Sequence, residues 1–195
     1  MRILSRLVLL GFLALPVLWA DPKMCVREAP IPESYTWNFP AEAVERFDEL
    51  RAGSREVMDR AAKLDAFTRH PRLMGWESHA IELDQVRFHI NDMGETLCRL
   101  QTIRHVLEPW QQKAVDRITP RLAALADQTE AAIEYLRENQ TYLADPAYAD
   151  YFDQIYEGSR DLREATTRYV DYAETTSEVE RLERTPQIEG LLPGS

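Results

Sequence analysis

Apolar residues recur at alternating spacings of three and four along four long stretches of this chain. The clearest stretch contains Trp76, Leu83, Val86, Ile90, Met93, Leu97, Leu100 and Leu107. Such spacing places apolar side chains on one side of an α-helix, and that side must be buried against other helices. The pattern therefore predicts four long amphipathic helices.

Prolines and polar residues mark where three of these helices begin or end. The first helix begins near Ala41 and ends before Pro71. A short connection containing Gly75 leads into the second helix. The fourth begins with Pro146, since proline suits the first turn of a helix, and continues to about Leu182.

The start of the third helix has two interpretations. A proline at the first helical position favours a start at Pro109, after a tight turn over residues 105–108. Thr119 followed by Pro120 is a competing start signal, because threonine caps helices well. A start at Pro109 with a bend at Pro120 gives helices of similar length, and we take this as the prediction.

Four such helices joined by short turns predict an all-α fold, an antiparallel up-down-up-down four-helix bundle over residues 41–184. Residues 21–40 contain several prolines and aromatic residues, so we expect an extended segment that packs on the helices. Residues 185–195 are expected to form a disordered tail. No alternation typical of β-strands competes with this interpretation.

Residues 1–20 have the pattern of a secretory signal peptide. Arg2 and Arg6 precede an apolar run from Leu7 to Trp19, and Ala20 stands before the first acidic residue. An apolar run of this length is shorter than the roughly twenty residues that a transmembrane helix needs. We therefore predict an exported protein, periplasmic or extracellular, without an integral membrane segment after cleavage.

The charge of the chain excludes one large class of partners. The formal net charge is -10, and removing the two signal-peptide arginines leaves -12. Affinity for nucleic acid depends on cationic side chains that displace counterions from phosphates. Nucleic acid is therefore not an expected partner.

Cys25 and Cys98 are the two cysteines of the chain. In an oxidising compartment two cysteines predict a disulfide, which would fix the N-terminal segment to the outer surface of the second helix. The alternative is a free redox-active pair. Catalytic pairs usually lie two residues apart, and this separation does not favour that alternative.

Histidine and methionine positions raise one cofactor hypothesis. His79 lies on the apolar side of the second helix, and Met58 and Met93 also lie on apolar sides, as in haem-binding bundles with a histidine and a methionine ligand. A histidine near a helix end more often forms a local hydrogen bond or reaches solvent. Haem or metal binding is therefore the alternative to a protein without a cofactor.

Enzyme chemistry has little support in the sequence. There is no Glu-x-x-His pair for a di-iron centre, no zinc-type cluster of cysteine and histidine and no phosphate-binding glycine loop. Ser54 and Ser159 lie within predicted helices rather than on the tight turns that present nucleophiles. The carboxylates mostly occupy positions typical of a solvated helix face. We predict no catalytic residues.

The fourth helix is rich in tyrosine, which is favoured at protein interfaces because it combines an apolar ring with a polar tip. Most of its tyrosines lie on or beside the apolar side, where packing explains them. Tyr156 and Tyr172 lie at the flanks. We predict these two as candidates for contact with a partner.

Three sequence segments carry a family resemblance: Glu108-Pro109-Trp110-Gln111, the run Gln128 to Leu136, and Tyr169-Val170-Asp171-Tyr172. With them, residues 76–182 resemble an uncharacterised family of exported bacterial proteins. The resemblance implies an all-helical protein of the cell envelope. It implies no catalytic residue.

The leading hypothesis is therefore a non-enzymatic exported bundle that acts through protein contacts, with a copy of itself or with an envelope component. A haem- or metal-binding bundle is the first alternative. A periplasmic holdase chaperone is the second.

Overall fold

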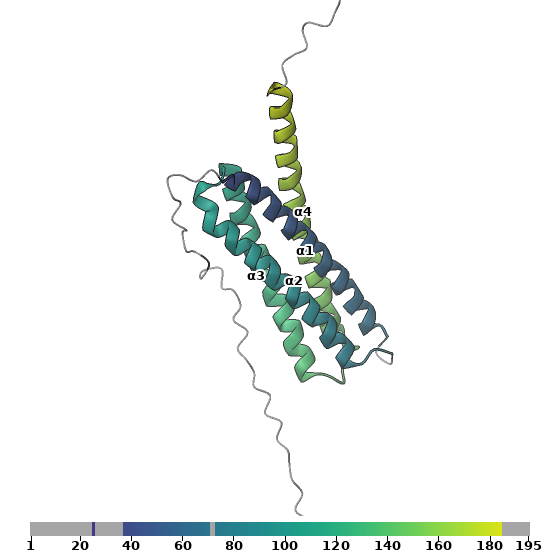
Figure 1. Cartoon of the computed structure of the whole chain (residues 1–195). Helices are drawn as coiled ribbons and strands as arrows, with labels where there is room; N and C mark the ends of the chain where they lie inside the picture. The colour runs from purple at the N-terminus through teal and green to yellow at the C-terminus, as the bar shows by residue number, and fades with distance from the viewer. Residues whose placement is uncertain (1–24, 26–36, 71–72, 185–195) are drawn as a thin grey trace, which may run out of the picture.

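The computed structural model describes Cys25 and residues 37–70 and 73–184 of the 195-residue chain. This part consists of α1 (Phe39–Thr68), α2 (Trp76–Ile103), the short 3₁₀ helix η1 (Arg104–Val106), α3 (Pro109–Glu138) and α4 (Pro146–Arg184). The α-helices form an antiparallel bundle in which each packs on the next and α1 packs on α4 (Figure 1). The predicted all-α four-helix bundle is confirmed. The predicted signal peptide, most of the extended segment and the tail lie outside the described residues.

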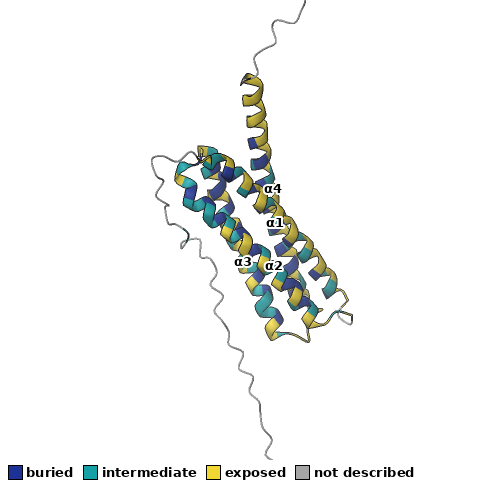
Figure 2. Ribbon diagram, viewed as in Figure 1, coloured by how far each residue is buried: buried dark blue, intermediate teal, exposed yellow. Residues whose placement is uncertain are grey.

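The core lies along the shared axis of the helices, where their buried faces meet (Figure 2). Nearly all apolar positions that the three-four spacing singled out are buried there. Trp76 is an exception, with 40% of its surface exposed. It is the first residue of α2, so no further turn of helix covers it, and its predicted place on the buried side is wrong.

Local capping explains the helix starts. At the start of α1, the Asn38 side chain accepts a hydrogen bond from the Ala41 backbone N–H at 3.1 Å, which moves the start two residues before the predicted Ala41. At the C-terminal end of α2, the α-helix stops at Ile103 and is followed directly by the 3₁₀ helix η1. Helix α3 begins at Pro109, as predicted.

Helix α3 is continuous through Pro120. Proline has no backbone N–H and so removes one hydrogen bond of the helix ladder. The neighbouring Thr119 hydroxyl donates to the Val115 carbonyl at 2.8 Å. A separate helix start at Pro120 is therefore excluded, and the bend there stays a prediction.

Four serine and threonine hydroxyls inside the bundle are satisfied within their own helices. Ser54, Thr129, Ser159 and Thr166 are all fully buried, and each donates to the carbonyl four residues earlier. This arrangement avoids the cost of a buried polar group without a partner. It also occupies the hydroxyls of Ser54 and Ser159, so neither of these serines is presented as a nucleophile.

Helices α1 and α2 approach closely at Gly53. A Cβ atom on this residue would lie 2.7 Å from Cγ and 3.0 Å from Sδ of Met93. The missing side chain therefore makes room for the buried Met93, whose sulfur also accepts the Ser54 hydroxyl at 3.6 Å. Met93 serves the packing of this pair of helices.

Two glutamates are buried between α1 and α2, although the sequence indicated solvated carboxylates. Glu42 accepts two hydrogen bonds from Arg99, at 2.7 and 3.1 Å, and a third from the indole of Trp37 at 2.7 Å. Glu82 accepts hydrogen bonds from Arg60 and Lys63. The burial of both was not predicted from the sequence, because the cations that compensate them lie mostly on the neighbouring helix.

These cations set the ionisation of the two carboxyls. Hydrogen bonding from Arg99 lowers the pKa of Glu42 below its ordinary value, against the opposing effect of burial. Burial alone would raise the pKa of Glu82, but the hydrogen bonds from Lys63 and Arg60 outweigh it and lower the pKa. Both residues therefore stabilise the fold as carboxylates, and this stabilisation is present above pH 4.5 and is lost as the pH falls through the lowered pKa.

The substitution Glu42→Gln is expected to lower the free energy of unfolding by about 1–2 kcal/mol at pH 7, because it removes charge-assisted hydrogen bonds to a partly exposed arginine. Urea denaturation measures this loss. The exposed Glu45→Gln is the matched control and should have little effect. The deficit should shrink as the pH falls below 4.5, and a deficit that does not change with pH would contradict this account.

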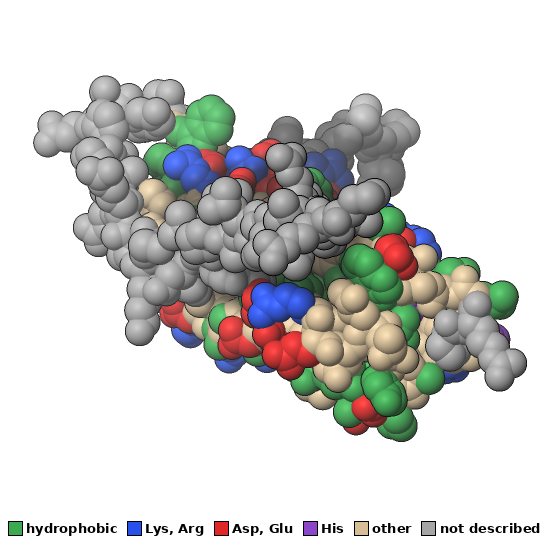
Figure 3. Space-filling view, turned by 90° about the horizontal axis from the view of Figure 1, so that it is seen from below, with side chains coloured by type: hydrophobic (Ala, Val, Ile, Leu, Met, Phe, Trp, Pro, Cys, Tyr) green, Lys and Arg blue, Asp and Glu red, His purple; other side chains and the backbone are tan. Residues whose placement is uncertain are grey.

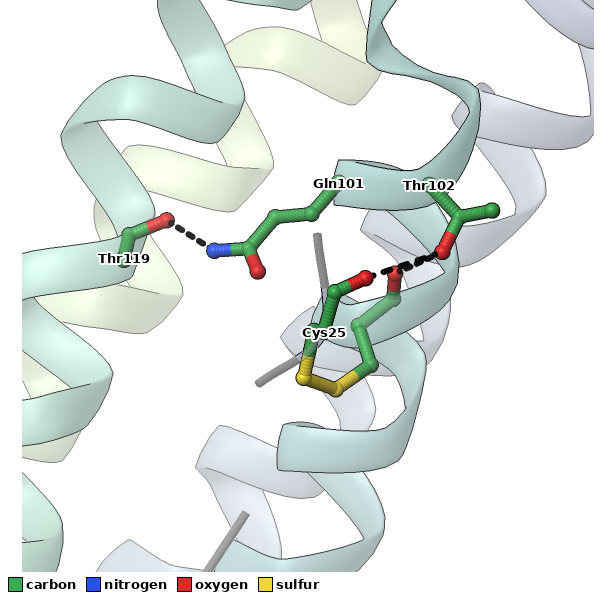
Figure 4. Close-up of a disulfide and its surroundings, with 5 residues drawn as sticks. Cys25, Gln101, Thr102 and Thr119 are labelled. Atoms are coloured by element: carbon green, nitrogen blue, oxygen red, sulfur yellow. Dashed lines mark hydrogen bonds between the residues drawn. A yellow bond between two sulfur atoms is a disulfide. The ribbon is translucent and has the colours of Figure 1, made fainter. Parts of the chain in front are cut away.

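Cys25 lies against α2 at disulfide-bonding distance from Cys98, with 5.0 Å between the Cα atoms (Figure 4). Thr102 of α2 donates to the carbonyl oxygens of both cysteines, at 3.4 Å to Cys25 and 2.9 Å to Cys98. Both cysteines are half-buried, outside the hydrophobic core. The pair therefore fixes a residue that precedes the bundle to the outer side of α2, as the sequence predicted.

Candidate interaction surface

The Glu-Pro-Trp-Gln segment forms the start of α3 and ties it to α1. Glu108 and Gln111 make a capping box, in which each side chain accepts from the backbone N–H of the other residue. The buried Gln111 amide also donates to the Pro40 carbonyl at 2.8 Å. This motif therefore has a structural role that joins two helix starts at one end of the bundle.

Trp110 of the same segment is the centre of an aromatic cluster, which we define as Phe47, Trp110, Tyr169 and Tyr172. Its ring lies 6.2 Å from Phe47 of α1, and 6.5 and 5.1 Å from Tyr169 and Tyr172 of α4. The indole N–H donates to Glu108 at 2.5 Å. Two of the sequence segments that carried the family resemblance thus meet at this cluster.

Helix α4 continues beyond the aromatic cluster without support from the other helices. It has 39 residues, whereas α1 and α3 have 30 each. Ala173 is its last buried residue, and from Glu174 to Glu183 all but the half-buried Thr176 are exposed. Figure 1 shows this end of α4 standing clear of the bundle. We call residues 174–184 the α4 extension, and at 1.5 Å per residue it is about 16 Å long.

The α4 extension carries an apolar stripe that leads back to the cluster. Tyr172, Val179 and Leu182 are 52%, 49% and 59% exposed. At 100° per residue their side chains fall within roughly 80° of the helix circumference. Because Tyr172 packs edge-on against Trp110, this α4 stripe (Tyr172, Val179 and Leu182) is continuous with the aromatic cluster.

The two tyrosines that were predicted to contact a partner differ in their exposure. Tyr156 is half-buried and packs against the hydrophobic core, whereas Tyr172 exposes half of its surface at the base of the α4 extension. Val179 and Leu182 were not singled out from the sequence. The length of the fourth helix could have indicated that they are exposed, because a helix longer than its neighbours projects beyond them.

Acidic residues surround the α4 stripe. Residues 171–184 contain five acidic and two basic residues, a formal charge of -3. Glu178 and Glu180 lie on opposite flanks of the stripe, and Arg181 pairs with Glu178 at 2.6 Å. Hydrogen bonding from Arg181 lowers the pKa of Glu178 below its ordinary value, so this flank stays ionised at neutral pH. The exposed surface of this helix therefore combines apolar side chains with negative charge.

His79 is fully buried at the opposite end of the bundle. Its ring packs against Phe67 of α1 and against Tyr148 and Phe152 of α4, with ring centroids 5.5, 5.5 and 6.4 Å away. Neither ring nitrogen has a hydrogen-bond partner, and burial lowers the pKa of His79. The expectation that it bonds locally or reaches solvent is wrong, because aromatic rings from two other helices enclose it.

The structure does not bring His79, Met58 and Met93 together. Met93 packs on Gly53, whereas His79 packs on Phe67, which lies fourteen residues further along α1 and so about 21 Å away. Met58 is half-buried and about 14 Å from Phe67 by the same reckoning. Neither methionine therefore packs against His79 in this arrangement. Within residues 37–70 and 73–184 and Cys25, no three His, Cys, Asp or Glu side chains gather as a metal site.

Other exposed apolar residues are more scattered. Leu73, Trp76 and Tyr142 lie at the end of the bundle where α1 runs into α2, and Ile81 and Phe88 lie on the outer side of α2. Figure 3 views this end, and hydrophobic side chains on the visible face alternate with polar and charged ones. An open groove of about 190 Å³ between α2 and α3 has apolar walls that include Trp76 and Leu136.

Across the described part of the chain, no helix is long and apolar enough to cross a membrane. Comparisons of the chain with protein-family models, curated proteins and solved structures found no match.

Proposed function

We propose that the protein is an exported, non-enzymatic helical bundle that acts through protein contacts, with the α4 stripe as its contact surface. The observation that carries the proposal is the projection of α4, which places Tyr172, Val179 and Leu182 in solvent on one face of a helix. Large exposed apolar residues arranged in one stripe are typical of interaction sites. Export is supported by the signal-peptide pattern and by the paired cysteines.

The length of the α4 extension adds to this argument. Helices of about a dozen residues are marginal in water when nothing packs on them. The extension continues a packed helix and has the exposed Glu178–Arg181 pair, which supports it weakly. A partner that packs along the stripe would bury its apolar face and stabilise the projecting turns.

The double substitution Val179→Gln and Leu182→Gln is expected to abolish contact with the partner while leaving the bundle folded. Both residues are exposed beyond the core, and glutamine keeps good helix propensity. The measurement is affinity capture with the mature protein from an extract of its own cells, followed by comparison of the proteins retained by each variant.

Ile81→Gln with Phe88→Gln is the matched control, because it also removes two exposed apolar residues from one helix face. The proposal expects a partner, or a second copy, that the wild type and the control retain and the α4 variant loses. Identical sets of retained proteins from all three would contradict it.

A further inference from the structure

The charge around the α4 stripe indicates what kind of surface fits it. Five acidic residues and two basic residues lie between positions 171 and 184, within a chain whose formal net charge is already -10. Glu178 and Glu180 flank the apolar residues on opposite sides of the helix. A partner that covers the stripe must therefore place its own flanking groups next to carboxylates.

A second copy of the chain fits this surface poorly. Two antiparallel α4 extensions would bring the acidic flanks of one helix against those of the other, and like charges at an interface disfavour association. A lipid surface with anionic head groups is disfavoured by the same charges.

We propose that the partner's docking element is a basic amphipathic helix, which lays an apolar stripe along Tyr172, Val179 and Leu182 and places lysine or arginine beside Glu178 and Glu180. This inference rests on the proposed function and names the chemistry of its partner. Helix-on-helix docking of this kind uses anchors three, four or seven residues apart, and neighbouring residues of the α4 stripe are seven and three residues apart. The acidic flanks supply charge complementarity, which steers the encounter and rejects acidic partners.

The aromatic cluster gives the docked helix a defined end. Trp110 is half-buried and contacts Tyr172 with ring centroids 5.1 Å apart. Trp and Tyr are favoured at the centres of interfaces because their large rings combine apolar area with a polar group. The partner helix therefore runs from the C-terminal end of α4 to the point where α4 passes the start of α3.

Two synthetic helical peptides test the inference with the mature protein. Each is about 18 residues long and carries leucines at the three-four spacing, with lysines elsewhere in one peptide and glutamates in the other. Fluorescence anisotropy of the labelled peptides measures binding at low and at moderate salt. The lysine peptide is expected to bind at least roughly tenfold more tightly than the glutamate peptide, with a preference that narrows as salt rises.

Variants separate specific docking from general attraction to an acidic protein. Val179→Gln with Leu182→Gln, and the set Glu174→Gln, Glu178→Gln, Glu180→Gln and Glu183→Gln, should each weaken lysine-peptide binding by roughly tenfold. The control set Glu45→Gln, Glu56→Gln, Glu95→Gln and Glu130→Gln changes the net charge equally at exposed positions elsewhere and should leave binding nearly unchanged.

Equal weakening by the two glutamine sets, with no effect of the apolar pair, would overturn the inference. Tight binding of the glutamate peptide to the stripe would also overturn it. If the apolar pair loses its cellular partner but the lysine peptide shows no preference, only the inference about partner charge fails. If the apolar pair retains every cellular partner, the proposed function fails.

Discussion

Replacing Cys25 and Cys98 together by serine is expected to lower the free energy of unfolding by about 4 kcal/mol. The link closes a sequence separation of 73 residues, and a cross-link of that span removes much of the conformational entropy of the unfolded chain. It joins a residue before α1 to the outer side of α2, so it restricts the first half of the bundle in the unfolded state.

Urea denaturation of the oxidised wild type, the reduced wild type and the double serine variant measures this effect. The reduced wild type should match the variant, which controls for the change of side chain. A loss below about 1 kcal/mol would show that the link constrains the unfolded chain far less than its span predicts.

The second large effect is expected on acidification, which should lower the free energy of unfolding through His79. Burial lowers the pKa of His79 in the folded state, so below pH 6.5 the unfolded chain binds a proton that the folded chain does not. Stability from this residue is therefore present above pH 6.5 and is lost at up to about 1.4 kcal/mol per pH unit as the pH falls towards the lowered pKa.

Among the residues that the structure describes, none gives a protonated His79 an anionic partner in direct contact. Tyr148 lies beside it with an unpaired hydroxyl, and Lys63 lies over the Phe67 ring with its nitrogen 5.6 Å from the ring centroid. Two carboxylates belong to the surrounding network through other side chains. Asp145 accepts the Tyr135 hydroxyl at 2.6 Å, and the Tyr135 ring stacks on Tyr148. Glu82 accepts a hydrogen bond from Lys63. A proton on His79 would therefore be poorly compensated.

His79→Leu tests this prediction. At pH 5 the variant should exceed the wild type in free energy of unfolding by about 2 kcal/mol, because it removes both the titration and two unpaired polar atoms. Urea denaturation between pH 5 and 8 gives the curves, and the exposed His105→Leu is the control. Parallel curves for wild type and His79→Leu would contradict this role of His79.

Much of the fold was predictable because helix periodicity is local information. The three-four spacing identified the buried faces of all four helices, and Pro109 marked the start of α3. The alternative helix start at Pro120 is wrong, because α3 continues through this proline. Terminal positions were less predictable, as Trp76 shows, since burial at a helix end depends on what other elements extend past it.

The environments of individual polar residues could not be predicted from the sequence, because they depend on contacts between helices. His79 is enclosed by rings from α1 and α4, and Glu82 is compensated by Arg60 and Lys63 of α1. The spacing of apolar residues along α2 alone does not predict these contacts. The α4 stripe was not predictable from apolar spacing for a different reason, since its exposure depends on α4 extending beyond the ends of the other helices.

The most direct test of the central claim places a photoreactive amino acid at Val179 in the protein made by its own cells, with Phe88 as the control position. The account predicts a discrete cross-linked product from position 179 and none of the same mass from position 88. The absence of any product from position 179, or the same product from both positions, would contradict the claim that the α4 extension is the contact surface.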